Sequence, residues 1–197
     1  MEIRRPTHQG SEELKLIFVT TNKYKLAEAM SAAAGTDFDI VASDIVLSEV
    51  QNDDLELISK NKAEQAFRIL GVPCIVDDTG LFIEEFNGFP GPYTAYVART
   101  LMLEGITSLL NGPAAAQFKT VLTYVDDTSM LSVKEDVDGL LNPNMLGDAR
   151  LLSDMFIPDR QNHSLSVLTE GLYESPRKKA FRQLFGLLER RKHAGNL

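Results

Sequence analysis

Cysteine and long apolar runs are almost absent from this sequence. Its single cysteine, Cys74, has no second cysteine in the chain with which to form a disulfide, and disulfides are rare in reducing compartments. No apolar run approaches the ~18 residues that a membrane-spanning helix needs. The first residues, MEIRRPTHQGSEE, lack the apolar centre of a secretory signal. These absences favour a cytoplasmic protein that does not bind membranes.

Positive charge is also in short supply. The chain has 20 lysines and arginines against 28 aspartates and glutamates, which gives a net charge of −8. Broad binding to nucleic acid or to an anionic membrane requires a basic surface, so we expect neither partner. A small anionic ligand would need a few basic side chains gathered at one site.

Repeats and low-complexity segments are missing as well. The chain has 197 residues, of which 44% are hydrophobic and 24% are charged, and this is enough for one sizeable core. Residues 1–13 are predicted to form a mobile tail. Residues 14–197 are predicted to form a single domain.

Apolar periodicity predicts alternating strands and helices along this domain. Apolar residues recur at helical spacing between about 55 and 70, and two apolar stretches flank the turn at 126–129 as in a strand pair. The segment 88–93 has the composition of a turn, and 139–147 resembles a loop. We expect a mixed α/β domain with a strand-rich lobe within 81–140. The predicted strands are 15–20, 38–42, 73–78, 118–125 and 130–137, and the predicted helices run from the turn after 20 to about 34 and over 55–70, 94–110 and 175–192.

The stretch at 16–25, LIFVTTNKYK, changes abruptly from four apolar residues to polar ones. If the apolar part is a strand and a helix follows, the polar part is a strand-to-helix turn. Backbone N–H groups at a helix N-terminus favour anions, Thr20, Thr21 and Asn22 add polar side chains, and Lys25 adds a positive charge. The alternative is that a threonine or Asn22 only caps the helix while Lys25 is solvated.

Two adjacent acids, Asp77 and Asp78, follow the apolar run at 74–76. A strand sends successive side chains to opposite faces, so at least one acid is directed at something other than its neighbour. An acid at the carboxyl end of a strand, where α/β sheets usually bind ligands, can hold a divalent cation or activate a water molecule. The alternative is an Asp78-Thr79-Gly80 turn, in which Asp78 bonds to the backbone two residues on.

Lys62 is the unusual residue of the predicted helix at 55–70. It lies along the apolar stripe, four residues after Ile58, whereas Lys60 is about 200° away on the solvent side. A lysine in such a stripe either extends past the core to solvent or meets an anion. Glu49, just before this helix, is a further candidate metal ligand, and the alternative for it is a solvated side chain.

Together these segments resemble the inosine triphosphate pyrophosphatase family, the Ham1-like pyrophosphatases of non-canonical purine nucleoside triphosphates. VTTNKYKLAEA matches the T-x-N-x-x-K-x-x-E signature, and LSEV, KNKAEQA and VDDTGLFIEEFNGFPGPY resemble the next motifs in the right order and spacing. The agreement is dense over about 15–95 and thins beyond it to FKTVLTYVDD, the loop at 139–147, MFIP and the final helix. The resemblance implies the family's α/β fold, a mixed elongated sheet flanked by helices, and a homodimer.

The resemblance also implies hydrolysis of a nucleoside triphosphate to the monophosphate and pyrophosphate, assisted by magnesium, with manganese as the alternative metal. Such a reaction needs a base, positive charge around the phosphate oxygens and a metal to orient the departing pyrophosphate. By motif position, Asp78 would activate the water and help to hold the metal, with Glu49 as partner carboxylate and Asp77 as a more distant or second-metal acid. Lys62 would act beside Asp78 in catalysis. The implied substrate-binding residues in this half are Thr20, Thr21, Asn22, Lys25, Lys62 and Thr79.

The C-terminal half departs from the family pattern. The family's base-holding Phe-Gly-Tyr/Trp-Asp-Pro loop corresponds to Arg150–Pro158 (RLLSDMFIP), which lacks the glycine and the aromatic residue, and Asp154 matches the family aspartate only after a one-residue shift. A family lysine falls near Gly171, and the family's Ser-His-Arg has become Ser-Pro-Arg at 175–177. Serine and proline start helices well, so the last helix should survive, but one polar group is lost. Asp154 and Arg177 remain candidate substrate contacts.

Three hypotheses follow from the matching half and the divergent half. The first is a pyrophosphatase with altered or relaxed base selectivity. The second is a catalytically weak nucleotide-binding homologue that acts through a partner, because losing site residues is also how enzymes decay. The third is a conventional inosine triphosphatase that reads the base through backbone contacts.

Overall fold

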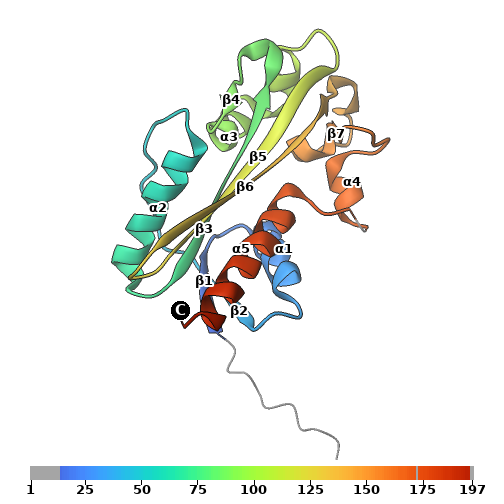
Figure 1. Cartoon of the computed structure of the whole chain (residues 1–197). Helices are drawn as coiled ribbons and strands as arrows, with labels where there is room; N and C mark the ends of the chain where they lie inside the picture. Colours follow the sequence, from blue (N-terminus) through green and yellow to red (C-terminus); the bar gives the residue numbers. More distant parts are fainter. Residues whose placement is uncertain (1–13, 172, 196–197) are drawn as a thin grey trace, which may run out of the picture.

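The computed structural model describes residues 14–171 and 173–195, and the predicted tail at 1–13 lies outside them. Figure 1 shows a long twisted sheet with helices on both of its faces. The sheet has seven strands in the order β2-β1-β3-β5-β6-β7, and β4 pairs with β3. Parallel pairing joins β1 to β2 and to β3, and antiparallel pairing joins the others. The strands are β1 (Leu14–Val19), β2 (Phe38–Ser43), β3 (Cys74–Ile83), β4 (Pro90–Gly91), β5 (Ala114–Val125), β6 (Met130–Leu141) and β7 (Phe156–Pro158).

Helices α1 and α5 pack on one face of the sheet, and α2 packs on the other (Figure 1). The mixed α/β fold with a flanked sheet is therefore confirmed. None of the helices in the described part of the chain is long and apolar enough to cross a membrane. The α-helices are α1 (Lys23–Ala33), α2 (Leu55–Leu70), α3 (Thr94–Thr107), α4 (Leu165–Thr169) and α5 (Pro176–His193), and the short 3₁₀ helices are η1 (Glu84–Phe86), η2 (Pro143–Met145) and η3 (Leu152–Asp154).

The core between the sheet and α1 and α5 is rich in aromatic side chains. Phe18 of β1 meets Phe181 of α5 edge to face at 5.1 Å between ring centroids, and Phe38 of β2 stacks on Phe185 at 5.4 Å. Such pairs stabilise a core by about 0.5–1.5 kcal/mol beyond their buried area. The predicted final helix is confirmed, with Ser175 as its N-cap accepting from the Lys178 backbone N–H at 3.0 Å.

A second core lies in the distal lobe, where β3, β5 and β6 continue beyond α1 and α5. Here α3, η3 and α4 cover the sheet, and their apolar side chains surround Phe118, which meets Phe156 edge to face at 5.0 Å. The strand-rich lobe predicted within 81–140 is thus present, although it also uses residues up to α4. The predicted strand pair at 118–125 and 130–137 is β5 and β6, each four residues longer than predicted at the end remote from their turn.

The prediction that a short strand ends at Asp78 is wrong, as is the alternative Asp78-Thr79-Gly80 turn. Strand β3 runs on to Ile83, and all ten of its residues pair with β5. The long partner strand keeps the backbone extended through the polar residues, and buried Leu81 and Ile83 anchor its far end. Gly80 is required there, because a Cβ at this position would lie 2.4 Å from the Gly91 carbonyl oxygen of β4.

Two other predicted segments are corrected. The loop predicted at 139–147 begins with three residues of β6, which pair with β7, and this pairing explains their extended backbone. The predicted turn at 88–93 contains the short strand β4, whose Pro90 and Gly91 pair with β3. The helix predicted at 94–110 is α3, but Met102 interrupts it with a φ of 57°.

The middle of β3 has an open edge, and the candidate site lies there. On the side away from β5, β1 pairs with β3 only at Cys74 and Ile75, and β4 pairs with it only at Leu81 and Phe82. In the described part of the chain, residues 76–80 therefore have no strand partner on that side. The two adjacent acids lie at the centre of this opening.

Candidate active site

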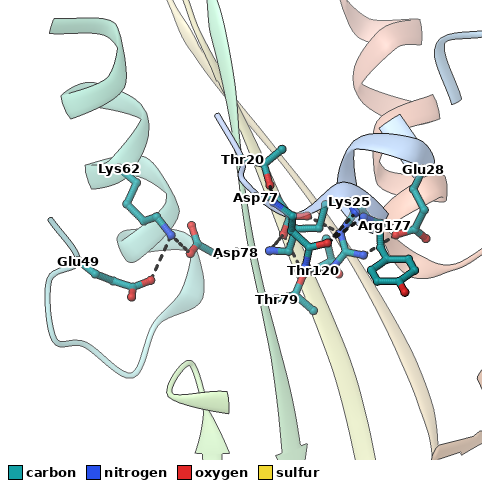
Figure 2. A network of polar contacts seen from close by, with 12 residues as sticks. Thr20, Lys25, Glu28, Glu49, Lys62, Asp77, Asp78, Thr79, Thr120 and Arg177 are labelled. Atoms are coloured by element: carbon teal, nitrogen blue, oxygen red, sulfur yellow. Dashed lines mark hydrogen bonds and ion pairs between the residues drawn. The ribbon is translucent and has the colours of Figure 1, made fainter. Parts of the chain in front are cut away.

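Strand β3 directs its two adjacent acids to opposite faces, as the two-residue repeat of a strand requires. Cys74 and Val76 face α2, so Asp78 faces the same way, whereas Asp77 faces α1 and α5. Both carboxylates are buried, with side-chain exposures of 1% for Asp77 and 6% for Asp78. Each therefore requires its own cationic partner, and Figure 2 shows two separate groups of charges on the two sides of the strand.

Asp78 and Glu49 share Lys62 on the α2 side (Figure 2). The Lys62 Nζ atom donates to Asp78 Oδ1 at 2.6 Å and to Glu49 Oε1 at 3.1 Å. The predicted position of Lys62 along the inward stripe of α2 is confirmed, and its partner is an anion. Glu49 is not an isolated solvated residue, although its side chain is 60% exposed.

The second oxygen of Asp78 has no partner. Oδ2 is buried without a hydrogen bond, which is costly for a carboxylate oxygen unless a ligand or ion uses it. Burial raises the pKa of Asp78 above its usual value, although the positive charge of Lys62 opposes this change. A buried carboxylate with one free oxygen and a raised pKa is suited to accept a proton or to bind a metal ion.

Asp77 is held by cations on the opposite face (Figure 2). The Lys25 Nζ atom lies 3.2 Å from Asp77 Oδ1, and Arg177 Nε donates to Oδ2. Burial by itself would raise the pKa of Asp77, but the charges of Arg177 and Lys25 outweigh it and lower the pKa to about 2. Asp77 is therefore a permanently charged anchor for these two cations.

Arg177 joins α5 to both β3 and α1. Besides Asp77, its guanidinium donates from Nη1 to Glu28 of α1 and from Nη2 to Thr79 Oγ1 at 3.1 Å. Ser175, the N-cap of α5, donates its hydroxyl to the other oxygen of Glu28. The Ser-Pro-Arg variant of the family motif thus forms a polar connection between the first and last helices.

The turn before α1 contains the predicted helix cap but not the solvated lysine that was expected with it. The Asn22 side chain caps the helix, accepting from the backbone N–H groups of Tyr24 at 2.9 Å and Lys25 at 3.3 Å, and Thr20 Oγ1 accepts from the Asn22 N–H at 3.1 Å. Lys25, however, is not solvated, because it reaches Asp77. The N-terminus of α1 therefore lies beside Asp77, and Thr21 is exposed just before it.

Thr79 and Asp154 are occupied by protein contacts. The Thr79 hydroxyl donates to Asp77 at 2.9 Å and also contacts Thr120 at 3.1 Å, so it supports the acid. Asp154 Oδ2 accepts from the backbone N–H groups of Arg150 at 2.7 Å and Leu151 at 2.8 Å, which fixes its own loop. Contact of either side chain with a substrate stays a prediction.

The predicted metal-ligand set is only partly assembled. Glu49 and Asp78 both contact the Lys62 Nζ atom, but Asp77 lies across the strand with its own cations. Within the described residues, no group of three or more His, Cys, Asp or Glu side chains is arranged to hold a metal ion. Mg²⁺ is usually held by one or two carboxylates together with substrate phosphates and water. The pair Glu49 and Asp78 supplies the number of carboxylates that this pattern needs.

Glu28 is the site residue for which the sequence predicted no role, and Ser175 was expected only to start the last helix. Glu28 is the final glutamate of the T-x-N-x-x-K-x-x-E signature, three residues after Lys25 and hence on the same side of α1. This spacing was the available signal. The opposing partner, Arg177, is 149 residues away in sequence, and no local pattern could identify it.

The charges at the open edge sum to −1. The set has three cations and four anions, so without a bound cation it has no net attraction for a polyphosphate, and a divalent ion makes the sum +1. The cations are Lys25, Lys62 and Arg177, and the anions are Glu28, Glu49, Asp77 and Asp78.

Comparison with known proteins gives matches over most of the chain. The sequence model of the Ham1 family matches residues 16–187. A dITP/XTP pyrophosphatase of Saccharolobus solfataricus is 33% identical over 181 residues, which cover 89% of this chain and 94% of that protein. A dITP/XTP pyrophosphatase of Pyrobaculum aerophilum is 34% identical over 183 residues, which cover 90% and 98% of the two chains.

Solved structures share the fold. A HAM1 protein from Coxiella burnetii superposes with a TM-score of 0.76 at 21% identity, and the match covers 90% of this chain and 99% of that one. The Ham1 protein of Staphylococcus aureus gives a TM-score of 0.72 at 21% identity with the same coverage. From the sequence matches over nearly the whole described domain, the chain belongs to the Ham1 family.

Proposed function

We propose that this protein hydrolyses a nucleoside triphosphate to the nucleoside monophosphate and pyrophosphate. The observation that carries the proposal is the open edge of β3, with Lys25 and Arg177 on one face and Lys62 beside the partly free Asp78 on the other. A base, separate cations and a metal-binding carboxylate pair are what phosphoryl transfer to water requires. The relatives named dITP/XTP pyrophosphatases support the same reaction.

In the proposed reaction, Asp78 takes a proton from a water molecule as the water oxygen attacks the α-phosphorus. The bond between the α-phosphorus and the oxygen bridging to the β-phosphorus then breaks, and pyrophosphate leaves with that oxygen. Asp78 Oδ2 is the oxygen available for the proton, since Oδ1 is bound to Lys62. Its raised pKa makes it a stronger base than an exposed aspartate.

Lys62, Lys25 and the N-terminus of α1 are proposed to bind the phosphate groups. Backbone N–H groups at a helix N-terminus attract anions, and Thr20 and Thr21 lie at this end of α1. The two lysines lie on opposite faces of β3, so they contact different parts of an extended polyphosphate. Glu49 and Asp78 are proposed to hold one Mg²⁺, or alternatively Mn²⁺, together with substrate phosphates. When bound, this ion neutralises phosphate charge and stabilises the leaving pyrophosphate.

Product identity tests the proposed function. We expect pyrophosphate, and no orthophosphate, when the protein is incubated with MgCl₂ and a panel of canonical and deaminated nucleoside triphosphates. EDTA in excess should abolish the release, because the charge at the open edge then stays negative. Coupled assays for pyrophosphate and orthophosphate, run in parallel on the same reactions, measure both outcomes. Orthophosphate released from the γ-position would contradict the proposal, as would turnover that persists in EDTA.

Relaxed base selectivity is the finer part of the proposal. The family loop that holds the base lacks its glycine and aromatic residue here, and the buried Pro176 has no polar side-chain group to offer. The Asp154 carboxylate is committed to its own loop. A site built to hydrogen-bond one base rejects others because mismatched polar groups stay buried without partners. With these groups missing, that discrimination should be shallow.

We expect kcat/KM for inosine triphosphate to exceed that for GTP by about tenfold or less, which corresponds to ~1.4 kcal/mol. Steady-state kinetics with both substrates at the same MgCl₂ concentration measure the ratio. The kcat/KM values for xanthosine triphosphate and ATP, whose bases carry other exocyclic groups, are measured in the same way. A preference of several hundredfold for inosine triphosphate would show that another part of the chain reads the base.

A further inference from the structure

Asp77 is shared by two cations that come from different helices. Lys25 of α1 contacts Oδ1 at 3.2 Å, and Arg177 of α5 contacts Oδ2. The carboxylate is almost fully buried, with 1% of its side chain exposed. One cation would be enough to neutralise it, so the second contact needs a reason.

Lys25 cannot serve both Asp77 and a substrate phosphate at full strength. To reach a phosphate it has to weaken or leave its contact with Asp77. If Lys25 were the sole partner, this movement would leave a buried charge uncompensated, which is strongly destabilising. Arg177 removes that obstacle as long as its guanidinium stays against Asp77.

Glu28 and Thr79 keep the guanidinium in this position. Nη1 of Arg177 is bound to Glu28 and Nη2 to Thr79, and the planar group has its orientation fixed by three contacts. Glu28 is itself fixed, because Ser175 donates to its other oxygen. Among the described residues, Glu28 is the acid other than Asp77 that forms an ion pair with Arg177.

We infer that Glu28 is a positioning residue for substrate binding: it holds Arg177 on Asp77 and so releases Lys25 for the phosphates. The inference rests on the proposed function, in which Lys25 is a phosphate ligand. It assigns a role to the last residue of the T-x-N-x-x-K-x-x-E motif. The competing explanation is that Glu28 only ties α1 to α5 and affects stability alone.

Binding of a non-hydrolysable substrate distinguishes the two explanations. We expect Glu28→Ala to weaken binding of α,β-methylene inosine triphosphate with MgCl₂ by about tenfold, within the usual coupling between contacting residues. Glu28→Gln, which keeps the size and one acceptor oxygen, should give an intermediate loss. Glu64→Ala removes an exposed glutamate paired with Arg68 on α2 and should leave the Kd within twofold. Isothermal titration calorimetry measures each Kd, and circular dichroism confirms that each variant is folded at the assay temperature.

The decisive measurement repeats Glu28→Ala in a Lys25→Met background. If Glu28 acts by releasing Lys25, the double variant should have a Kd within twofold of that of Lys25→Met alone. A loss of equal size in both backgrounds would overturn the inference, as would a lowered Tm with an unchanged Kd in the single variant. Failure of the wild-type protein to bind the analogue would also overturn it. If the Kd values change as expected but no triphosphate yields pyrophosphate, the proposed hydrolysis is rejected and the inference stands.

Discussion

Replacement of Asp78 with asparagine is expected to reduce kcat by a factor of about 10²–10⁴, the usual contribution of a general base. An amide cannot accept the proton of the attacking water, and it is a weaker ligand for Mg²⁺ than a carboxylate. The fold should survive, because asparagine has the same shape and its amide oxygen can still accept from Lys62. The full pairing of β3 with β5 also holds the backbone at this position.

Pyrophosphate release at saturating inosine triphosphate and MgCl₂ measures the effect, with circular dichroism as the check on folding. Asp127→Asn is the matched control, since Asp127 is an exposed aspartate in the turn between β5 and β6. It should have a wild-type rate. If Asp78→Asn retains a rate close to that of wild type, then Asp78 is neither the base nor a required metal ligand.

Replacement of Lys62 with methionine is expected to weaken triphosphate binding by roughly 10–100-fold, the loss typical of hydrogen bonds to charged groups. Methionine preserves the apolar stem along the α2 stripe, so the change removes mainly the charge. The side chain of Lys62 is 19% exposed and contacts two acids. Its loss also leaves Asp78 without its cation, which further raises the pKa of that carboxyl group.

Lys60→Met on the same helix is the control for Lys62→Met. The side chain of Lys60 is 47% exposed and pairs with Glu56 one turn earlier, an interaction that contributes little. We expect its KM to stay within twofold of wild type. Steady-state kinetics and thermal unfolding of both variants provide the comparison. Equally small changes in KM would mean that Lys62 pairs with Asp78 and Glu49 without contributing to substrate binding.

The positions of the N-terminal site residues were predictable because their signals are local. A strand that turns into a capped helix, as at 16–25, is determined by a few adjacent residues, and the inward position of Lys62 follows from helical spacing alone. The separation of Asp77 from Asp78 also follows from strand alternation. The assignment of Asp77 to a metal did not account for Arg177, which reaches it from a helix 100 residues later in sequence.

The length of β3 and the short elements near the C-terminus were harder to predict. Asp77, Asp78 and Gly80 are poor strand formers by themselves, and pairing with β5 keeps them extended. Strand β7 has three residues and η3 has three, too few for any periodic signal. Their conformation depends on pairing with β6 and on packing against Phe118, and neither contact has a local signature.

The connection between Glu28 and Arg177 has a consequence for the protein while it is being synthesised. During synthesis, α1 and all the described strands leave the ribosome before α5, because chains emerge from the N-terminus onward. Until α5 has emerged, the apolar side chains of β1 and β2 that pack on Phe181 and Phe185 are uncovered, and Asp77 lacks its guanidinium partner. A nascent chain thus carries Lys25, Glu28 and Asp77 early, but it cannot complete the ion pairs around Asp77 until the last helix docks.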